Sequence, residues 1–389
     1  MVVGCARLAV CAPLLLGLLG VCQGRQFSAD CPSYNIIHPC RCSATMLGLR
    51  VLCAGVANEQ TLRNLLGYLS NYRMNALTLQ HINFTVTPDL FSRLQAVTIK
   101  ITESQFRMQD TRRPGRSPVA SRVEDLDVRQ STLDLGNSNL AVMQGLRRVV
   151  VDASNISILK KSWFDGLSRL TLFAIENTQL GGLEDRALAG LNEVHSISLT
   201  ADGLKYLRRS YFPTFAARLM DLDFRCICCV NVATCLARDP AAAAMAFFTS
   251  PIAVPQASFS KLPRDDRKTR WQSVRLLSGW CSREHRAPRI RRSDNKLTSL
   301  PHDMFENMPV LESVMLSRNK FKTLSPAPWR PMLRQLHSIK LDGNPIDCGA
   351  NISWLLEGDA RHKISGTCTT PRLLAGVSIS ELNDTRYSR

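Results

Sequence analysis

The sequence predicts an α/β solenoid, with a curved parallel sheet on its concave face and short helices, 3-10 turns and loops on its convex face. The first observation behind this prediction is a repeat. Leu146, Leu170, Val194 and Leu219 each begin the pattern apolar-x-x-apolar-x-apolar, and these starting residues lie 24, 24 and 25 positions apart. The second is that six cysteines lie in two groups that flank the repeats. One short unit cannot bury its own apolar face, so it must stack on its neighbours.

Each unit is expected to consist of a strand and a convex segment. An apolar-x-apolar pair with polar neighbours, such as Val149 and Val151, is typical of a short half-buried strand. A period of about two dozen residues is the length of a leucine-rich repeat, so the predicted fold is a leucine-rich-repeat solenoid with disulfide caps. The convex segments are expected to bury a second apolar set, namely Ile158, Phe164 and Leu167, then Leu183, Leu188 and Leu191, then Leu207, Phe212 and Phe215.

Residues 1–24 are predicted to be a secretory signal peptide. Arg7 precedes an apolar run from Leu8 to Val21, and Gly24 supplies a small residue at the cleavage site. No later segment of the sequence is long and apolar enough to span a membrane. We therefore expect a secreted, extracellular protein.

Residues 25–73 are expected to form an N-terminal cysteine-rich cap. Cys31, Cys40, Cys42 and Cys53 form an even set in a chain expected to be secreted, which favours disulfides. A zinc site is the competing interpretation, but the spacing lacks a Cys-x-x-Cys pair. The spacing leaves the connectivity open. Apolar residues at helical intervals between 59 and 68 predict a short helix after the cysteines.

The first repeat block spans residues 74–225 and contains a predicted loop insertion at 107–122. The run Arg112-Arg113-Pro114-Gly115-Arg116 combines proline, glycine and charge, which marks a loop. This insertion is either a basic binding loop or a solvated surface insertion, and surface loops of the second kind are common.

The repeat breaks at residues 226–292. This block carries 12 Lys and Arg residues against 4 acidic residues, so it supplies +8 of the formal net charge of +17. It contains five cysteines and no apolar period. It is either a disordered functional insertion, a metal-binding cysteine knuckle, or a segment that is not native coding sequence, such as translated intron. Its length without a structural pattern favours the last of these.

The second repeat block spans residues 293–344. Joining Arg225 directly to Ser293 nearly restores the period, so the break falls inside one repeat. Three asparagines then recur in register, at Asn295, Asn319 and Asn344. We expect their side chains to satisfy buried backbone groups between neighbouring coils.

Residues 345–389 are predicted to form the C-terminal cap and a tail. A helix that carries Trp354 is expected to cover the open edge of the last repeat, and a disulfide between Cys348 and Cys368 is expected to hold it there.

Glycosylation sequons begin at Asn83, Asn351 and Asn383, and these three are expected to be modified in a secreted chain. A fourth sequon, Asn155-Ile156-Ser157, falls where the asparagine of a repeat usually turns inward. We therefore expect Asn155 to be a buried residue rather than a glycosylation site.

The sequence contains no motif of an enzyme site. It has no glycine-rich phosphate loop, no Gly-x-Ser-x-Gly turn and no His-Glu-x-x-His pair. We expect a non-enzymatic protein without a cofactor or a metal. In stacked repeats, the outward side chains of the concave sheet form the default binding surface. The candidates on this surface are Asp127, Arg129, Asp152, Glu176, Ser198, Thr200, Ser317, Lys340 and Asp342.

From Cys31 to Asp384, apart from 226–292, the chain resembles extracellular leucine-rich-repeat proteins that have cysteine caps at both ends. The motifs that carry this resemblance are Pro39-Cys40-Arg41-Cys42, Ser293-Asp294-Asn295-Lys296-Leu297, Leu341-Asp342-Gly343-Asn344-Pro345 and the Trp354 cap. The resemblance implies that Cys31 pairs with Cys42 and Cys40 with Cys53. The chain departs from the family at Ala350, where a second cysteine is usual, so one of the usual two C-terminal disulfides is absent.

More narrowly, the chain resembles arthropod proteins similar to the non-catalytic subunit of oplophorus-luciferin 2-monooxygenase. The pointers are the long first spacing of the N-terminal cap, the weakly regular early repeats and the segment from Leu341 to Asp347. In that family the repeat chain accompanies a separate catalytic subunit. The resemblance implies a hetero-oligomer in which this chain has an accessory role and is not itself the catalyst.

The leading functional hypothesis is a secreted scaffold that binds a protein partner through its concave face. One alternative is a binder of polyanions, such as a glycan or nucleic acid, through the basic insertions, although nucleic acid is the less favoured partner. The other alternative is a subunit that participates directly in luciferin oxidation, for which no group of residues in the sequence provides support.

Overall fold

A computed structural model of the chain describes residues 30–109, 121–202, 204–225, 295–355 and 358–382. The expected signal peptide (1–24), the 226–292 block, the side chain of Asn351 and the sequon at Asn383 lie outside the described residues.

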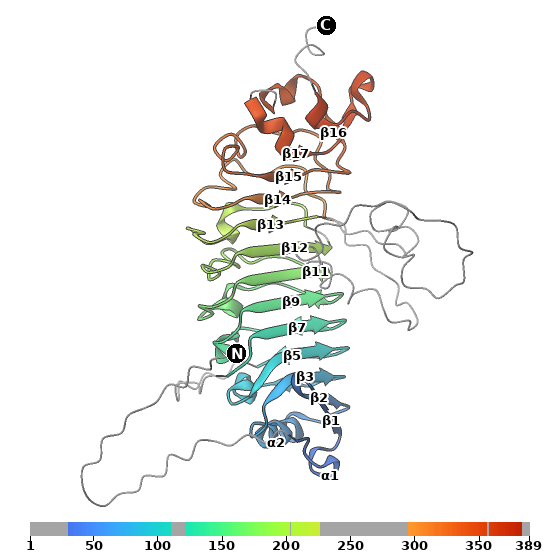
Figure 1. Cartoon of the computed structure of the whole chain (residues 1–389), viewed down its shortest axis with the longest axis vertical. Helices are drawn as coiled ribbons and strands as arrows, with labels where there is room; N and C mark the ends of the chain where they lie inside the picture. Colours follow the sequence, from blue (N-terminus) through green and yellow to red (C-terminus); the bar gives the residue numbers. More distant parts are fainter. Residues whose placement is uncertain (1–29, 110–120, 203, 226–294, 356–357, 383–389) are drawn as a thin grey trace, which may run out of the picture.

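The main sheet takes one strand from each coil and runs the length of the molecule (Figure 1). Its described strands are parallel except for β1 and β2, which form an antiparallel hairpin at the N-terminal end. In stacking order the strands are β1 (Cys40–Thr45), β2 (Gly48–Ala54), β3 (Met74–Gln80), β5 (Ala96–Thr102), β7 (Asp125–Arg129), β9 (Arg148–Asp152), β11 (Leu172–Leu180), β12 (Ser196–Asp202), β13 (Asp221–Asp223), β14 (Ser313–Met315), β15 (Ser338–Lys340) and β17 (Ile364–Ser365).

The inward side chains of neighbouring strands stack as rungs of one core. Val149 pairs with Phe173, Phe173 pairs with Ile197, and the series continues through Leu222 to Val314. Each of these side chains is at most 2% exposed. The predicted leucine-rich-repeat solenoid is confirmed by this register. The regular sequence period produces this stack of buried side chains, because each coil contributes one strand whose apolar pair points to the same side of the sheet.

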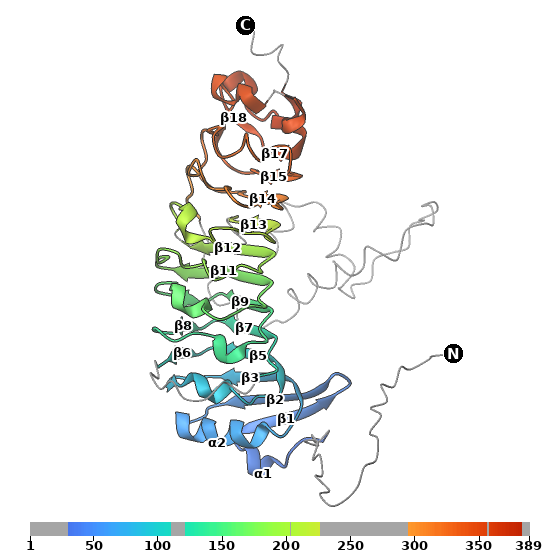
Figure 2. The same ribbon diagram turned by 90° about the vertical axis from the view of Figure 1, so that its left-hand side faces the viewer.

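A second parallel ladder, which the sequence reading did not predict, lines the other side of the first coils. It consists of β4 (Thr85–Val86), β6 (Gln105–Met108), β8 (Thr132–Asp134) and β10 (Asn155–Ile156). Figure 2 shows β6 and β8 on the side of the solenoid away from β5 and β7. The predicted loop at 107–122 therefore begins too early. Arg107 and Met108 belong to β6, where they pair with Thr85 and Val86 of β4. The side chain of Met108 is buried, at 5% exposure.

Hydroxyl groups hold successive coils together where the main strands turn into this second ladder. The amide of Ile82 donates to Ser104 Oγ (3.0 Å), Ser104 N to Ser131 Oγ (3.1 Å), Ser131 N to Ser154 Oγ (3.2 Å) and Ser154 N to Thr178 Oγ1 (3.3 Å). In return, each hydroxyl donates to the carbonyl two residues before it at 2.7 Å. In the second block the buried Asn295, Asn319 and Asn344 take over this role.

The prediction that Asn155 is buried is wrong. Ser154 occupies the inward position of that turn, with its residue only 7% exposed, while Asn155 is exposed. A short hydroxyl satisfies the neighbouring backbone groups as well as a carboxamide does, so the asparagine is displaced to the outer surface by one position.

The convex segments are short 3-10 helices and turns, as expected. The described helices are α1 (Tyr34–Ile37), η1 (Pro88–Phe91), α2 (Glu59–Leu69), η2 (Ala141–Met143), η3 (Lys161–Phe164), η4 (Arg209–Tyr211), η5 (Ala350–Leu355), η6 (Gly358–Lys363), η7 (Arg372–Leu374) and η8 (Ile379–Glu381). Two members of the expected convex apolar set are wrong. Ile158 is 49% exposed and Phe215 is 57% exposed, and their neighbours Leu159 (1%) and Ala216 (2%) fill the core instead.

Two coils approach each other closely at Gly181, which explains why this position has no side chain. A Cβ at Gly181 would overlap the backbone carbonyl oxygen of Ser157, whereas a Cβ at Gly182 would meet nothing within 4 Å. Gly181→Ala is expected to destabilise the fold by about 2 kcal/mol or more, because backbone must move to admit the methyl group. Gly182→Ala is the control and should change the free energy of unfolding by less than about 0.5 kcal/mol. Equal midpoints for the two variants in thermal denaturation would contradict this packing.

The N-terminal cap contains the two expected disulfides and the expected helix. Cys31 is bonded to Cys42, and Cys40 to Cys53 across the β1–β2 pair. Helix α2 begins after Asn58, whose Oδ1 accepts the backbone N–H of Thr61 at 2.9 Å. Its buried leucines cover the first coil, so the apolar edge of the sheet does not face water.

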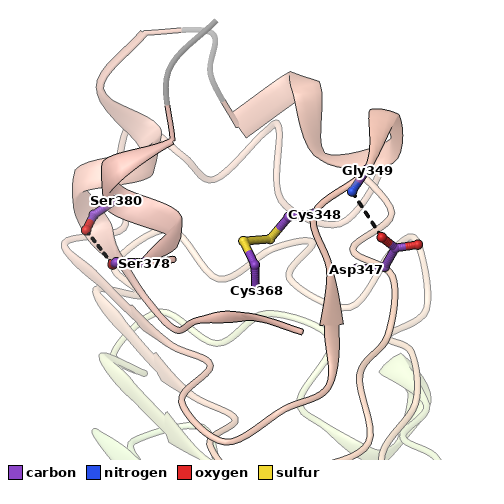
Figure 3. Close-up of a disulfide and its surroundings, with 6 residues drawn as sticks. All are labelled: Asp347, Cys348, Gly349, Cys368, Ser378 and Ser380. Atoms are coloured by element: carbon purple, nitrogen blue, oxygen red, sulfur yellow. Dashed lines mark hydrogen bonds between the residues drawn. A yellow bond between two sulfur atoms is a disulfide. The ribbon is translucent and has the colours of Figure 1, made fainter. Parts of the chain in front are cut away.

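The C-terminal cap is held by the Cys348–Cys368 disulfide (Figure 3). This bond joins Cys348, the residue after β16 (Ile346–Asp347), to the first residue of β18 (Cys368–Thr370), and the two strands form a small separate sheet. Trp354 lies on the 3-10 helix η5, is 5% exposed, and its indole N–H donates to the carbonyl of Leu324 at 3.0 Å. The expected cover over the last repeat is therefore present as 3-10 turns.

Candidate binding surface on the concave face

The concave face consists of the side chains that alternate with the buried rungs of the main sheet. Register places them in columns across the coils. One column runs from Asp127 through Ser198 to Asp223 and on to Lys340. The next column contains Arg129, Asp152, Glu176 and Thr200 on successive strands. Polar groups far apart in the sequence thus become neighbours because each coil adds one strand.

Two aspartate–arginine pairs bound the central part of this face. On β7, Arg129 Nε donates to Asp127 Oδ1 at 2.8 Å. Four strands further on, Arg225 follows β13 and binds both oxygens of Asp223, with Nη2 at 2.6 Å from Oδ2. The aspartates are buried, at 6% and 7% exposure, so their charges need these partners. In each pair the aspartate bond raises the pKa of the arginine further.

Between the two pairs lies a carboxylate with no such partner. Among the described residues, no side chain lies within hydrogen-bond or ion-pair distance of the half-buried Glu176 carboxylate. Burial raises the pKa of Glu176, and the negative charges of Asp152 and Asp223 raise it further, while Arg148 and Arg225 act in the opposite direction. Its neighbour Asp152 is better satisfied, because Asn177 Nδ2 donates to Asp152 Oδ1 at 2.9 Å.

Neutralising Glu176 should therefore stabilise the protein. Because its folded-state pKa is raised, the ionised carboxylate opposes folding, and the stability it contributes when protonated is lost as pH rises through the folded pKa. Glu176→Gln is expected to have a higher thermal midpoint than wild type at pH 7. The difference should shrink below pH 4, where the wild-type carboxyl is protonated in both states. A lower midpoint for Glu176→Gln at pH 7 would contradict this description of the surface.

The structure separates the predicted candidates into groups. Asp127, Arg129, Asp152 and Glu176 lie together in the centre of the face, as neighbours in adjacent strands. Ser317, Lys340 and Asp342 lie at its C-terminal end, where Lys340 and Asp342 are exposed, and Asp342 Oδ2 accepts a hydrogen bond from Ser365 Oγ.

Two candidates are not available at the surface. Thr200 is 1% exposed, and its hydroxyl donates to the carbonyl of Ile175 at 3.4 Å, so it joins two coils. Ser198 is 9% exposed, and its hydroxyl has no hydrogen-bond partner among the described residues. Thr200 pairs in register with Glu176, and its hydroxyl bonds to the preceding coil as the hydroxyl of Thr178 does to the carbonyl of Val151 at 3.3 Å.

The candidate set from the sequence omitted Arg148 and Arg225, two cations that face the central carboxylates. A signal for Arg225 was present in the chain. Asp221-Leu222-Asp223-Phe224-Arg225 repeats the pattern of Asp125-Leu126-Asp127-Val128-Arg129. Both segments place an aspartate and an arginine two positions apart on one face of a strand. Comparison of the two segments would have predicted the second pair from the first.

Within the part of the chain that the structure describes, no group of three or more His, Cys, Asp or Glu residues is arranged to hold a metal ion. No described helix has the length and apolar character needed to cross a membrane.

Comparison with known proteins bears on the repeats. A family model described as leucine rich repeat matches residues 144–204 and 293–346. A search of curated proteins finds no significant match. Solved structures that are similar include human 5T4 (Wnt-activated inhibitory factor 1, trophoblast glycoprotein), with 14% identity, a TM-score of 0.41 and coverage of 86% of this chain and 93% of that one.

Two further similar structures belong to complexes. One is TLR13 in its complex with ssRNA13, with 14% identity, a TM-score of 0.41 and coverage of 81% of this chain, which spans only 34% of the TLR13 chain. The other is in an octameric complex of Latrophilin 3, Unc5D and FLRT2, with 13% identity, a TM-score of 0.38 and coverage of 82% of this chain and 91% of that one.

Proposed function

Because the chain is a leucine-rich-repeat protein with disulfides near both ends, we propose that it is a secreted, non-enzymatic scaffold that binds a protein partner through its concave face. Stacked repeats make an extended surface, and the binding sites of solenoids use such surfaces. Support for secretion comes from the sequence of residues 1–24 and from the three disulfides, which persist in oxidising compartments.

The observation that carries the proposal is the unpaired carboxylate of Glu176 between two Asp–Arg pairs. A half-buried carboxylate held beside Asp152 and Asp223 opposes folding, as its raised pKa indicates. Groups that reduce stability in this way are concentrated at functional sites. A partner that presents a basic or hydrogen-bond-donating side chain at Glu176 would relieve the repulsion among these carboxylates.

Binding to a panel of purified extracellular proteins, measured with wild type and charge-reversal variants, tests the proposal. For the partner found, Glu176→Lys is expected to weaken binding by at least about tenfold, which corresponds to about 1.4 kcal/mol. The matched control is Asp165→Lys, which reverses an exposed acid after η3 on the convex side and should leave binding unchanged. Equal losses in both variants, or a loss only in the control, would overturn the concave-face proposal.

A glycan placed on the concave face offers a sharper version of this test. Glu176→Asn makes positions 176–178 a glycosylation sequon, because Asn177 and Thr178 follow. The glycan attached in the centre of the face should abolish binding of a protein partner by steric exclusion. Glu176→Gln removes the same charge without adding a glycan and separates the two effects.

The resemblance to the non-catalytic subunit of oplophorus-luciferin 2-monooxygenase gives the proposal a more specific form, that of an accessory subunit in a luciferase-like complex. Co-expression with a candidate catalytic subunit should then give a stable hetero-oligomer whose activity resides in that other chain. Oxidation of a coelenterazine-like luciferin by this purified chain alone would replace the scaffold proposal with direct participation in the reaction.

Binding of a polyanion is the other functional candidate, and the net charge of +17 is the observation that favours it. Its signature is affinity for heparin that falls steeply with salt concentration. Because 226–292 supplies +8 of that charge, deletion of this block should remove most of the heparin affinity if it is the site. The concave-face variants should then have no effect on heparin binding.

A further inference from the structure

The turn from β9 into β10 directs consecutive residues to opposite sides of the coil. Ser154 points inward, where its hydroxyl donates to the carbonyl of Asp152 and accepts the amide of Ser131. Ile156 also points inward and is fully buried. Asn155 lies between them and is exposed, as is Ser157. Among the described residues, no group lies within hydrogen-bond distance of the Asn155 carboxamide.

Asn155 is therefore the exposed first residue of a sequon, Asn155-Ile156-Ser157. Its backbone, by contrast, is fixed. The amide donates to the carbonyl of Ser131 at 2.8 Å, and β10 pairs with β8 on one side and β11 on the other. The side chain of Asn155 projects from this fixed strand away from the core, so a glycan attached to it would disturb no packed group.

A second sequon lies in register with the first. Thr132 of β8 pairs with Asn155 on one side and with Gln105 of β6 on the other. Arg107, two residues after Gln105, pairs with Thr85 of β4. Asn83 therefore occupies the place opposite Gln105, in the same column three coils away. Asn83 and Thr85 are exposed, and Asn83 Oδ1 accepts the amide of Gln105 at 3.3 Å. At about 4.8 Å between strands, the two asparagines are roughly 14 Å apart.

We propose that Asn155 is an N-glycosylation site, and that glycans on Asn155 and Asn83 cover the flank formed by β4, β6, β8 and β10. The inference rests on the secretion that the proposed function includes. In the reaction, Asn155 Nδ2 attacks C1 of the sugar in a lipid-diphosphate-linked oligosaccharide. A C–N bond forms, the bond from C1 to the diphosphate oxygen breaks, the lipid diphosphate leaves, and Nδ2 gives up one proton.

This arrangement has a consequence for where a partner can bind. The flank is a polar column with exposed residues, including Gln105 and Gln179, and two glycans there would exclude other macromolecules from it. The main sheet lies on the opposite side of the coils, where Figure 2 shows β5 and β7 away from β6 and β8. The glycans thus restrict a protein partner to the main sheet and its C-terminal end.

The test is site occupancy in full-length protein secreted from eukaryotic cells. Peptide-N-glycosidase treatment in heavy-oxygen water converts each glycosylated asparagine to a labelled aspartate. Trypsin then releases residues 149–160, in which Asn155 is the only asparagine, and residues 74–93, in which Asn83 is the only asparagine that begins a sequon. Label is expected in both peptides. Asn155→Gln and Ser157→Ala should each remove one glycan from the intact protein, while Ser157→Thr should keep it.

The outcomes distinguish this inference from the proposed function. Secreted protein with a labelled 74–93 peptide and an unlabelled 149–160 peptide would overturn the assignment of Asn155 and leave secretion intact. Protein that stays inside the cell without label in either peptide would overturn both. Because Asn155 is on the flank, Asn155→Gln should also leave partner binding unchanged, and a loss of binding equal to that of Glu176→Lys would contradict the placement of the glycan outside the binding surface.

Discussion

Replacement of Phe173 by alanine is expected to lower the free energy of unfolding by about 3–5 kcal/mol. Phe173 is the β11 rung of the core and is 1% exposed. Its ring packs edge-on against Phe164, with the ring centroids 4.9 Å apart. It also lines an enclosed apolar cavity of about 20 Å³, so the core beside it is already incompletely filled. Removal of the ring enlarges this cavity between coils whose backbones are fixed by the sheet on both sides.

Denaturant unfolding followed by circular dichroism measures this effect. Phe173→Leu is the graded control, because it keeps most of the apolar volume and should lose only about 1–1.5 kcal/mol. A loss below about 1 kcal/mol for Phe173→Ala would show that Phe173 is not a central rung. The midpoint and the slope should be compared together, because a change in the slope would mean that the variant no longer unfolds in the same single transition.

Asn319→Ala is expected to destabilise the protein by about 2–4 kcal/mol, because it leaves several buried backbone groups without partners. Asn319 is 1% exposed. Its Oδ1 accepts the amide of Leu297 at 3.2 Å, and its Nδ2 donates to the carbonyls of Phe224 and Leu316, each at 2.9 Å. One carboxamide thus satisfies two backbone groups of the preceding coil and one of its own. The loss should be greater than for a typical hydrogen bond, since no water can reach these groups.

The matched control is Asn192→Ala, which changes an exposed asparagine in the turn before β12. It should change the free energy of unfolding by less than about 0.5 kcal/mol. Thermal midpoints of the two variants, measured in the same buffer, give the comparison. If Asn319→Ala were as mild as the control, the asparagine ladder would not hold the coils together.

The main sheet could be predicted from the sequence because its signal is periodic. Val149, Phe173 and Ile197 recur at a fixed interval and each stands in the same local pattern, so one repeat predicts the next. The second ladder could not be predicted in this way. Its strands are as short as the two residues of β10, and a two-residue strand carries no alternation that distinguishes it from a turn.

The turn residues show a second limit of sequence reasoning. Asn155 stands one position from where Ser154 turns inward, and both residue types can satisfy backbone groups in a turn. Only the backbone direction decides between them, and Ala153, with φ of 48°, sets that direction. On the convex side, Ile158 and Leu159 are adjacent apolar residues, and without a regular helix or strand no period shows which one is buried.

The candidate surface was predicted in position but only partly in composition. Alternation along a strand correctly places Asp127, Asp152 and Glu176 on the same face. It does not show which members are covered, because Thr200 stands in register with the half-buried Glu176 and is nevertheless only 1% exposed, with its hydroxyl bonded to the carbonyl of Ile175. Arg225 was missed since it follows the last residue of a short strand, β13.

The central claim is that the two repeat blocks form one continuous solenoid. Asn295 Nδ2 donates to the carbonyls of Leu199 (2.8 Å) and Phe224 (3.0 Å), so the start of the second block completes the coil that the first block begins. If Arg225 is joined to Asp294, Asn295 becomes the third residue after Phe224, just as Asn319 is the third after Leu316. The interval from Leu219 to Leu311 then becomes 24 positions, the same as from Leu146 to Leu170.

Calorimetric unfolding of the variant that lacks residues 226–293 is the most direct measurement of this claim. A continuous solenoid predicts a secreted, folded protein with one cooperative transition, whose free energy of unfolding is within roughly 1 kcal/mol of wild type. In that variant Asn319→Ala should lower the midpoint of the whole transition. Two separate transitions, with Asn319→Ala lowering only one of them, would show that the blocks fold independently and would contradict the claim.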